Sequence, residues 1–222
     1  NLFDTDEDGA GISTNINLTD NISLGVGYTV DPDDSGNKAD VGLFKDYNVS
    51  TNLNYAGDNF DVGIGYNLGQ DGTGDDFAGS GSSDVTQNAV GARGAVRLGS
   101  RTEIGGWASY VDLDINTLNG ALNLETEGWS FGANIAFFDI GKEGSKLGVA
   151  FASPTFFDEF KLNDVDQGTF QQDRTYIAEV SYDFPVNDNV SITPGFFAVF
   201  NPDRNEDNDT IYVGVIRTSF SF

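Results

Sequence analysis

The fold of this chain is decided by a stretch in which large apolar residues alternate with small or polar ones, Phe60-Asp61-Val62-Gly63-Ile64-Gly65-Tyr66-Asn67-Leu68. A second stretch repeats the pattern, Trp129-Ser130-Phe131-Gly132-Ala133-Asn134-Ile135-Ala136-Phe137. Successive side chains of a β-strand point to opposite faces of the sheet. The two-residue period therefore predicts strands that have one large, apolar face and one small, polar face.

The same alternation recurs along the whole chain and predicts about eleven strands and no helix. The other runs lie at residues 10–18, 22–30, 48–56, 87–98, 102–112, 146–153, 174–184, 190–200 and 210–222. Short connections at 19–21, 57–59, 99–101, 139–145 and 185–189 alternate with long ones at 31–47, 69–86, 113–125, 154–173 and 201–209. This sorting is typical of outer-membrane barrels, which have short periplasmic turns and long extracellular loops.

These features predict an all-β fold, a transmembrane antiparallel up-and-down β-barrel, with residues 1–222 forming one domain. Gly, Ala, Ser and Asn side chains are too small to fill a barrel, so the polar face is expected to enclose water or a plug. Closed bacterial barrels generally have an even number of strands. The chain is therefore expected to be the C-terminal part, about eleven strands, of a larger barrel of about 16 strands whose first strands it lacks.

The large, apolar face is expected to contact outer-membrane lipid. Aromatic side chains near strand ends gather at the two membrane interfaces of such barrels. The residues expected in these girdles are Phe60, Tyr66, Phe137, Phe184, Tyr212, Phe220 and Phe222.

Composition excludes several classes of function. Among 222 residues, 35 are Asp or Glu and 11 are Lys or Arg, so the net charge is -24 and nucleic-acid binding is not expected. The chain has no His and no Cys, which removes His-dependent nucleophile systems and thiolate chemistry, and we expect no enzyme activity. Aromatic residues make up 13% of the chain, so it is expected to fold despite its charge.

Few positive charges fall on the predicted inner face or its rim. These are Arg93, Arg97, Arg174 and Arg217, and Glu179 is expected at a similar height in the wall. Rings of charge at a constriction set ion preference, so these five residues are candidates for a pore constriction. The alternative is that they are wall residues in an ion-pair network of the lumen, without a selective role. The acidic residues gather in the long loops, where they form either a cation-attracting rim or simply a solvated surface.

Two acidic segments suggest a calcium site. Asp4-Thr5-Asp6-Glu7-Asp8-Gly9 matches the start of a calcium-binding loop, but Asn15 stands where an EF-hand requires a bidentate Glu. The EF-hand is therefore rejected, and a weaker divalent-cation site remains a prediction for Asp4, Asp6 and Asp8. A similar oxygen-rich group contains Asp203, Asp207 and Asp209. No other cofactor is expected.

Three segments close the chain with a distinctive pattern. They are Asn187-Asp188-Asn189-Val190-Ser191-Ile192-Thr193-Pro194-Gly195, Asn201-Pro202-Asp203-Arg204-Asn205 with its acidic continuation to Thr210, and Val213-Gly214-Val215-Ile216-Arg217-Thr218-Ser219-Phe220-Ser221-Phe222. This pattern resembles the C-terminus of the cyanobacterial OprB-like porins, and Leu18-Thr19-Asp20-Asn21-Ile22-Ser23-Leu24 fits too. The resemblance implies a cyanobacterial outer-membrane protein whose terminal Phe222 is recognised by the barrel-assembly machinery. The family usually carries an N-terminal S-layer homology domain, which we expect to be absent from these residues.

The predicted function is that of a porin. Small hydrophilic solutes or inorganic ions would diffuse passively through a water-filled lumen, past a charged constriction and acidic extracellular loops. The family includes carbohydrate-selective and iron-uptake porins, and the residues leave the solute open. Porins of this architecture are often trimers, so a homotrimer is expected. The alternative is a structural or adhesive outer-membrane barrel with an occluded lumen and cation-binding loops.

Overall fold

The computed structural model describes residues 10–30, 47–74, 83–117, 122–169 and 172–221. Within these ranges the chain forms twelve β-strands and one short 3-10 helix, η3 (Pro202–Arg204). The strands are β1 (Ala10–Asn17), β2 (Ile22–Val30), β3 (Tyr47–Ala56), β4 (Phe60–Gly74), β5 (Ser83–Leu98), β6 (Thr102–Thr117), β7 (Leu122–Phe138), β8 (Lys146–Leu162), β9 (Val165–Thr169), β10 (Tyr176–Asn187), β11 (Val190–Phe200) and β12 (Ile211–Phe220). No helix in the described ranges is long and apolar enough to cross a membrane.

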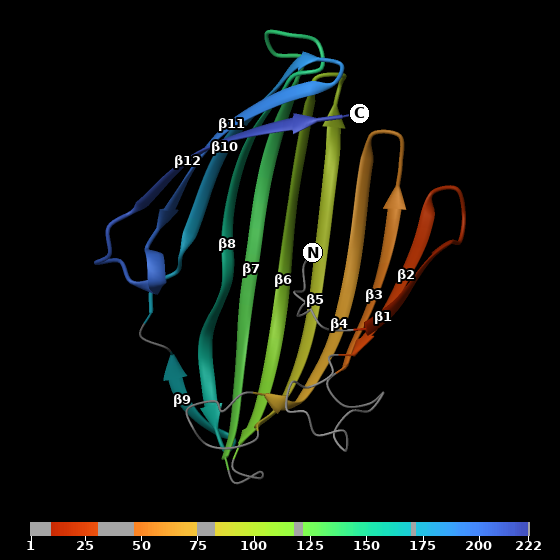
Figure 1. The fold of residues 1–222 in the computed structure, drawn as a ribbon. Helices are drawn as coiled ribbons and strands as arrows, with labels where there is room; N and C mark the ends of the chain where they lie inside the picture. Colours follow the sequence, from red (N-terminus) through yellow and green to blue (C-terminus); the bar gives the residue numbers. More distant parts are fainter. Residues whose placement is uncertain (1–9, 31–46, 75–82, 118–121, 170–171, 222) are drawn as a thin grey trace.

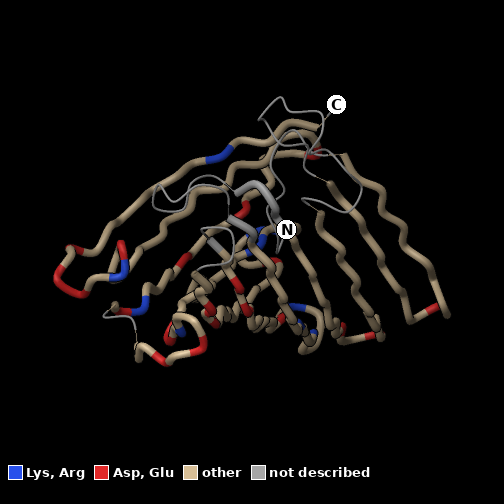
Figure 2. The backbone as a smooth tube through the Cα atoms, turned by 90° about the horizontal axis from the view of Figure 1, so that it is seen from below, with Lys and Arg blue, Asp and Glu red and all other residues tan. Residues whose placement is uncertain are grey.

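The strands form one antiparallel sheet in which neighbours in sequence are neighbours in space. The order is β1-β2-β3-β4-β5-β6-β7-β8-β10-β11-β12, and β9 pairs only with β8 (Figure 1). Seen from below, the sheet curves into an arc (Figure 2), and β1 and β12 are the two ends of its strand order. No pairing joins β1 to β12 among the described residues. The eleven strands of this path confirm the predicted antiparallel meander and give a curved barrel wall.

The two faces of the sheet differ as the alternation predicts. Large side chains on the convex face are exposed, for example Ile64 at 59%, Trp129 at 51% and Tyr212 at 65%. A soluble β-sandwich would bury such residues between two layers. Here, apart from glycines and Pro202, only four apolar residues of the described part are buried, namely Ala89, Ala136, Phe156 and Ala198. The apolar surface of this single-layer sheet therefore needs a partner outside the sheet, as the wall of a membrane barrel does.

Aromatic residues pair across strands on this face. Stacked rings join Tyr55 to Phe60, Phe151 to Tyr176, and Phe196 to Tyr212. Of the predicted girdle, Phe60, Tyr66, Phe184, Tyr212 and Phe220 are exposed and Phe137 is half-buried, while Phe222 lies outside the described residues. Their contact with a membrane interface stays a prediction.

The predicted long connections at 69–86, 113–125 and 154–173 are shorter in the structure, because β4 continues to Gly74 before β5 begins at Ser83, β6 continues to Thr117 before β7 begins at Leu122, and β8 continues to Leu162 and turns back into β9. The register of β8 with β7 shifts twice, between Trp129 and Phe131, opposite Pro154, and between Glu127 and Gly128, so the alternation of β8 changes phase at the first shift and returns at the second. A proline cannot donate to the ladder, which is consistent with the bulge. Asn163 and Asp164 then form the two-residue turn, both with positive φ as a type I′ hairpin requires.

Replacing Ile64 by Lys should test which face of the sheet contacts lipid. A Lys on a lipid-facing strand costs about 2–4 kcal/mol near the middle of the bilayer, because its charge is desolvated. Ala95→Lys is the matched control, since Ala95 lies on the concave face beside Asp61. We expect Ile64→Lys to lower the free energy of unfolding in phospholipid vesicles, measured by urea titration, far more than the control. Equal losses would contradict a lipid-facing convex surface.

Candidate functional site

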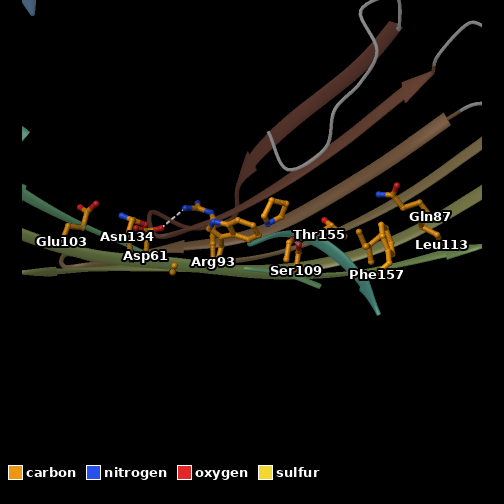
Figure 3. A pocket seen from close by; sticks show the side chains of 18 residues that line it. Asp61, Gln87, Arg93, Glu103, Ser109, Leu113, Asn134, Thr155 and Phe157 are labelled. Atoms are coloured by element: carbon orange, nitrogen blue, oxygen red, sulfur yellow. Dashed lines mark hydrogen bonds and ion pairs between the residues drawn. The ribbon is translucent and has the colours of Figure 1, made fainter. Parts of the chain in front are cut away.

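The candidate site is a groove on the concave wall, of about 910 Å³, formed mainly by β4 to β8. Asp61, Arg93, Glu103, Ser109 and Asn134 point into it from the turn-side half (Figure 3). Thr155, Phe157, Gln87 and Leu113 lie toward the long-loop end of the same surface. Alternation explains the orientation of the residues from β4 to β7, because these positions have the phase opposite to that of the exposed apolar residues, whereas Thr155 and Phe157 reach this face through the bulge of β8. The groove therefore presents charged, hydroxyl and amide groups among small and apolar residues, on the side that would face a barrel lumen.

Arg93 forms the best-defined charged contact in this groove. Its Nη1 atom lies 2.9 Å from the Oδ1 atom of Asp61, and its Nη2 atom donates a hydrogen bond to the Oδ1 atom of Asn54 at 3.1 Å. The three side chains come from β5, β4 and β3. The Arg93 and Asp61 side chains are 53% and 41% exposed, so the pair is solvated and adds only about 0–1 kcal/mol to stability. The main effect of this ion pair is to hold one positive and one negative side chain next to each other on the wall.

Glycines on the wall make room for side chains that lie across them. A methyl group at Gly132 would lie 2.8 Å from the indole nitrogen of Trp107, and one at Gly63 would lie 2.5 Å from Asn54 Oδ1 and 3.3 Å from Arg93 Nε. Contacts below about 3.0 Å require the neighbour to move. Trp107, Asn54 and Arg93 can therefore lie against the strands rather than project from them, because the facing residue has no side chain.

Three other predicted residues share the concave face but do not meet in one cluster. Arg97 lies over the ring of Phe138, 4.3 Å from its centroid. Glu179 is opposite Ala150 and Phe197, and Arg217 is opposite Thr193. None of the three forms an ion pair in the described part of the chain. Charge is thus spread along the wall, and a ring-shaped constriction stays a prediction.

Comparison with known proteins places the chain in a family. Residues 3–222 match the family described as "Carbohydrate-selective porin, OprB family". The chain belongs to the OprB family. It is 33% identical over 247 aligned positions to the uncharacterized protein sll0772 of Synechocystis sp., covering 96% of this chain and 43% of that protein. It is 34% identical over 137 positions to the uncharacterized protein alr4550 of Nostoc sp., covering 62% of this chain and 22% of the relative. The chain thus spans less than half the length of these relatives.

Solved structures show the same fold in outer-membrane proteins. Two structures of OmpT, an outer membrane protein of Vibrio cholerae, match with a TM-score of 0.58. The form folded in vitro is 12% identical and the form expressed in the outer membrane is 11% identical. They cover 95% and 96% of this chain, and this chain covers 64% and 65% of theirs. At this identity the likeness concerns the fold alone, and it confirms the predicted class of antiparallel outer-membrane β-barrels.

Arg174, predicted on the inner face or its rim, packs on the convex side of this OprB-family wall. Its guanidinium packs over Phe156 at 4.5 Å and Phe131 at 5.7 Å, two aromatic residues of the convex side. It also lies 3.6 Å from the Oδ2 atom of Asp158 and donates to the carbonyl of Trp129 at 3.3 Å. Arg174 lies two residues before Tyr176, whose ring stacks on Phe151 of the convex face, so it has the phase of that face and fills space beside the bulge of β8.

The predicted calcium sites find no support in the structure. Within the described ranges no three acidic side chains come close enough to hold a metal ion, and these ranges include Asp203, Asp207 and Asp209. Instead, Asn205 Oδ1 accepts from the backbone N–H of Asp207 at 2.9 Å, and Asp173 Oδ2 accepts from that of Glu206 at 2.8 Å. These bonds build the loop between β11 and β12. Asp4, Asp6 and Asp8 lie outside the described residues.

Sequence reasoning missed four residues of the concave wall as site candidates, namely Asn54, Asp61, Trp107 and Lys146. Asp61 and Asn54 follow the alternation and were detectable as polar-face residues, but their contact with Arg93 depends on the register of three strands. Trp107 also has the phase of the concave face, and its register partners are Arg93 and Gly132. Lys146 is the first residue of β8, and at the end of a strand the two-residue period does not determine on which face a side chain lies.

Gly132→Ala should displace Trp107 from the wall, because the added methyl group would overlap the indole. The chain has two tryptophans, so the Trp129→Phe background makes Trp107 the sole fluorescent reporter. We expect emission at longer wavelength and stronger acrylamide quenching. Gly214→Ala is the matched control, since a methyl group there meets no atom within 4 Å. Identical spectra for Gly132→Ala and its parent would contradict the placement of Trp107.

Proposed function

We propose that this OprB-family chain forms part of the wall of an outer-membrane porin through which small hydrophilic solutes or inorganic ions diffuse passively. The observation that carries the proposal is the contrast between the two faces of one sheet. The convex face is apolar and exposed, and the concave face holds the solvated Arg93–Asp61 pair in a polar groove. A wall of this kind separates lipid from water, which is the physical requirement for a pore.

The finer properties of the porin belong to the same proposal. The family description names carbohydrate as the selected solute of its members, and a groove lined by hydroxyl, amide and charged groups beside Trp107 suits small hydrophilic solutes. The many acidic residues on the long-loop side should raise the local concentration of cations there, although salt screens exposed charges over distances beyond about 8 Å. We further propose a cyanobacterial outer-membrane location, assembly through the terminal Phe222 and a homotrimer. No enzyme activity is part of the proposal.

Conductance tests the proposed pore directly. The purified full-length protein, added to a planar bilayer, should produce stepwise increases in current, because each inserted barrel opens a water-filled path. Liposomes carrying the protein should also swell in solutions of small sugars and stay intact in a large dextran. A protein that inserts but gives neither current steps nor swelling would instead support a structural or adhesive barrel.

Removing either member of the Arg93–Asp61 pair should shift ion selectivity in opposite directions. One unit charge 4 Å from a permeating ion is worth about 1 kcal/mol in water, so a change of up to about fivefold in permeability ratio is expected. Arg93→Gln should raise the potassium-to-chloride permeability ratio and Asp61→Asn should lower it, as measured from reversal potentials in a salt gradient.

Lys161→Gln is the control for this pair of variants. It removes one positive charge from the side chain that lies 3.6 Å from Glu125, opposite a convex-face position of β7. We expect little change in the permeability ratio, because this charge lies outside the groove. If all three variants behaved alike, the Arg93–Asp61 pair would not face the permeation path.

A further inference from the structure

Two positive side chains share one aromatic ring near the turn-side end of the concave wall. The guanidinium carbon of Arg97 lies 4.3 Å from the centroid of Phe138, and the Nζ atom of Lys146 lies 5.8 Å from the same centroid. Arg97 is near the end of β5, Phe138 ends β7 and Lys146 begins β8. Both cations are exposed. Two positive side chains from strands that are not hydrogen-bonded neighbours thus lie within 5.8 Å of the centroid of the same ring.

Neither cation is neutralised by an ion pair in the described part of the chain, although carboxylates lie in adjacent strands. Glu103 is the register partner of Arg97, and Asp183 is the register partner of Lys146. Neither carboxylate comes within 4.0 Å of its cationic partner. Asp183 instead accepts a hydrogen bond from the hydroxyl of Thr193 at 2.9 Å. In a chain with 35 acidic residues, two cations left without a carboxylate partner expose donors toward the proposed lumen.

We propose that Arg97 and Lys146 form a binding station for the oxyanion group of a small solute, such as a phosphate or a carboxylate. The guanidinium offers a planar fork of donors and the ammonium offers three more, and both groups bind oxyanions through charge-assisted hydrogen bonds. Phe138 holds the two cations in place through its ring face. The inference rests on the proposed function, because the station lies on the face that would line the lumen and its role there is to bind a permeating solute.

The carboxylates nearby define how the station works. Glu103 and Asp183 reduce the long-range positive potential, so the station attracts an anion mainly by direct contact with its donors. The loop side of the described chain is acidic, with Asp158, Asp164, Asp166 and Asp173 near the ends of β8, β9 and β10. The acidic residues near the long loops therefore repel an anion, whereas Arg97 and Lys146 near the short turns offer hydrogen-bond donors to it. The station should accordingly be reached more easily from the turn side.

Inorganic phosphate is the probe that tests this station. Binding to the full-length protein in detergent is measured by titration calorimetry at constant ionic strength. Arg97→Gln and Lys146→Gln should each weaken phosphate binding by about tenfold, because each removes charge-assisted donors. Arg97→Lys retains the charge and should lose less than Arg97→Gln. Lys161→Gln, the matched loss of one charge on the other face, should leave the affinity unchanged.

Bilayer currents provide the second measurement. Phosphate added from the turn side should reduce chloride current at lower concentration than phosphate added from the loop side, and Arg97→Gln should abolish the difference. Phosphate affinity that is unchanged in Arg97→Gln and Lys146→Gln would overturn the station even where the protein conducts. Affinity lost in these variants without any channel would instead retain the station and reject the pore, so the two proposals fail separately.

Discussion

Continuous antiparallel hydrogen bonding is the constraint on which the rest of this wall depends. A backbone group left unpaired in hydrocarbon costs several kcal/mol, so each strand of a membrane sheet must pair along its length. Pairing also determines register, and a slip by one residue would exchange the two faces of a strand. The pairing of Gly65 with Gly91, and of Gly63 with Arg93, therefore decides more than local stability. It decides that the side chain of Ile64 lies on the convex face and that the side chain of Arg93 lies in the groove of the concave face.

The glycine-rich concave face follows from that constraint. Because neighbouring strands are only about 4.8 Å apart, a long side chain can lie along the wall only where the adjacent residue is small. Gly132 accommodates Trp107 in this way, and Gly105 has Asn134 Oδ1 2.9 Å from the position of a methyl group. Glycine here weakens the strand locally but lets polar and aromatic groups cover the wall without filling the space in front of it. The outcome is a thin sheet with a polar surface.

The positively charged side chains of the wall differ in whether they have a carboxylate partner and in how far they lie along the strands. Arg93 forms an ion pair with Asp61 in the groove. Arg97 and Lys146, near the turns, contact the ring of Phe138 and form no ion pair among the described residues. Arg174 and Lys161, near the long loops, are paired with Asp158 and Glu125. Among the described residues, concave-face cations such as Arg97 and Lys146, which have no carboxylate partner, thus lie near the turn-side end of the wall, although the chain has a net charge of -24.

The sequence by itself determined most of the strands and the sidedness of residues such as Ile64 and Gly65, because both are local consequences of a two-residue period. Tertiary structure decided the rest. The bulge opposite Pro154 changed the phase of β8 and brought Thr155 and Phe157 to the concave groove. The contacts of Arg93 with Asp61 and Asn54, and of Arg97 with Phe138, required the registers of three strands at once. Periodicity tells on which face a side chain lies, but only register tells which side chain lies beside it.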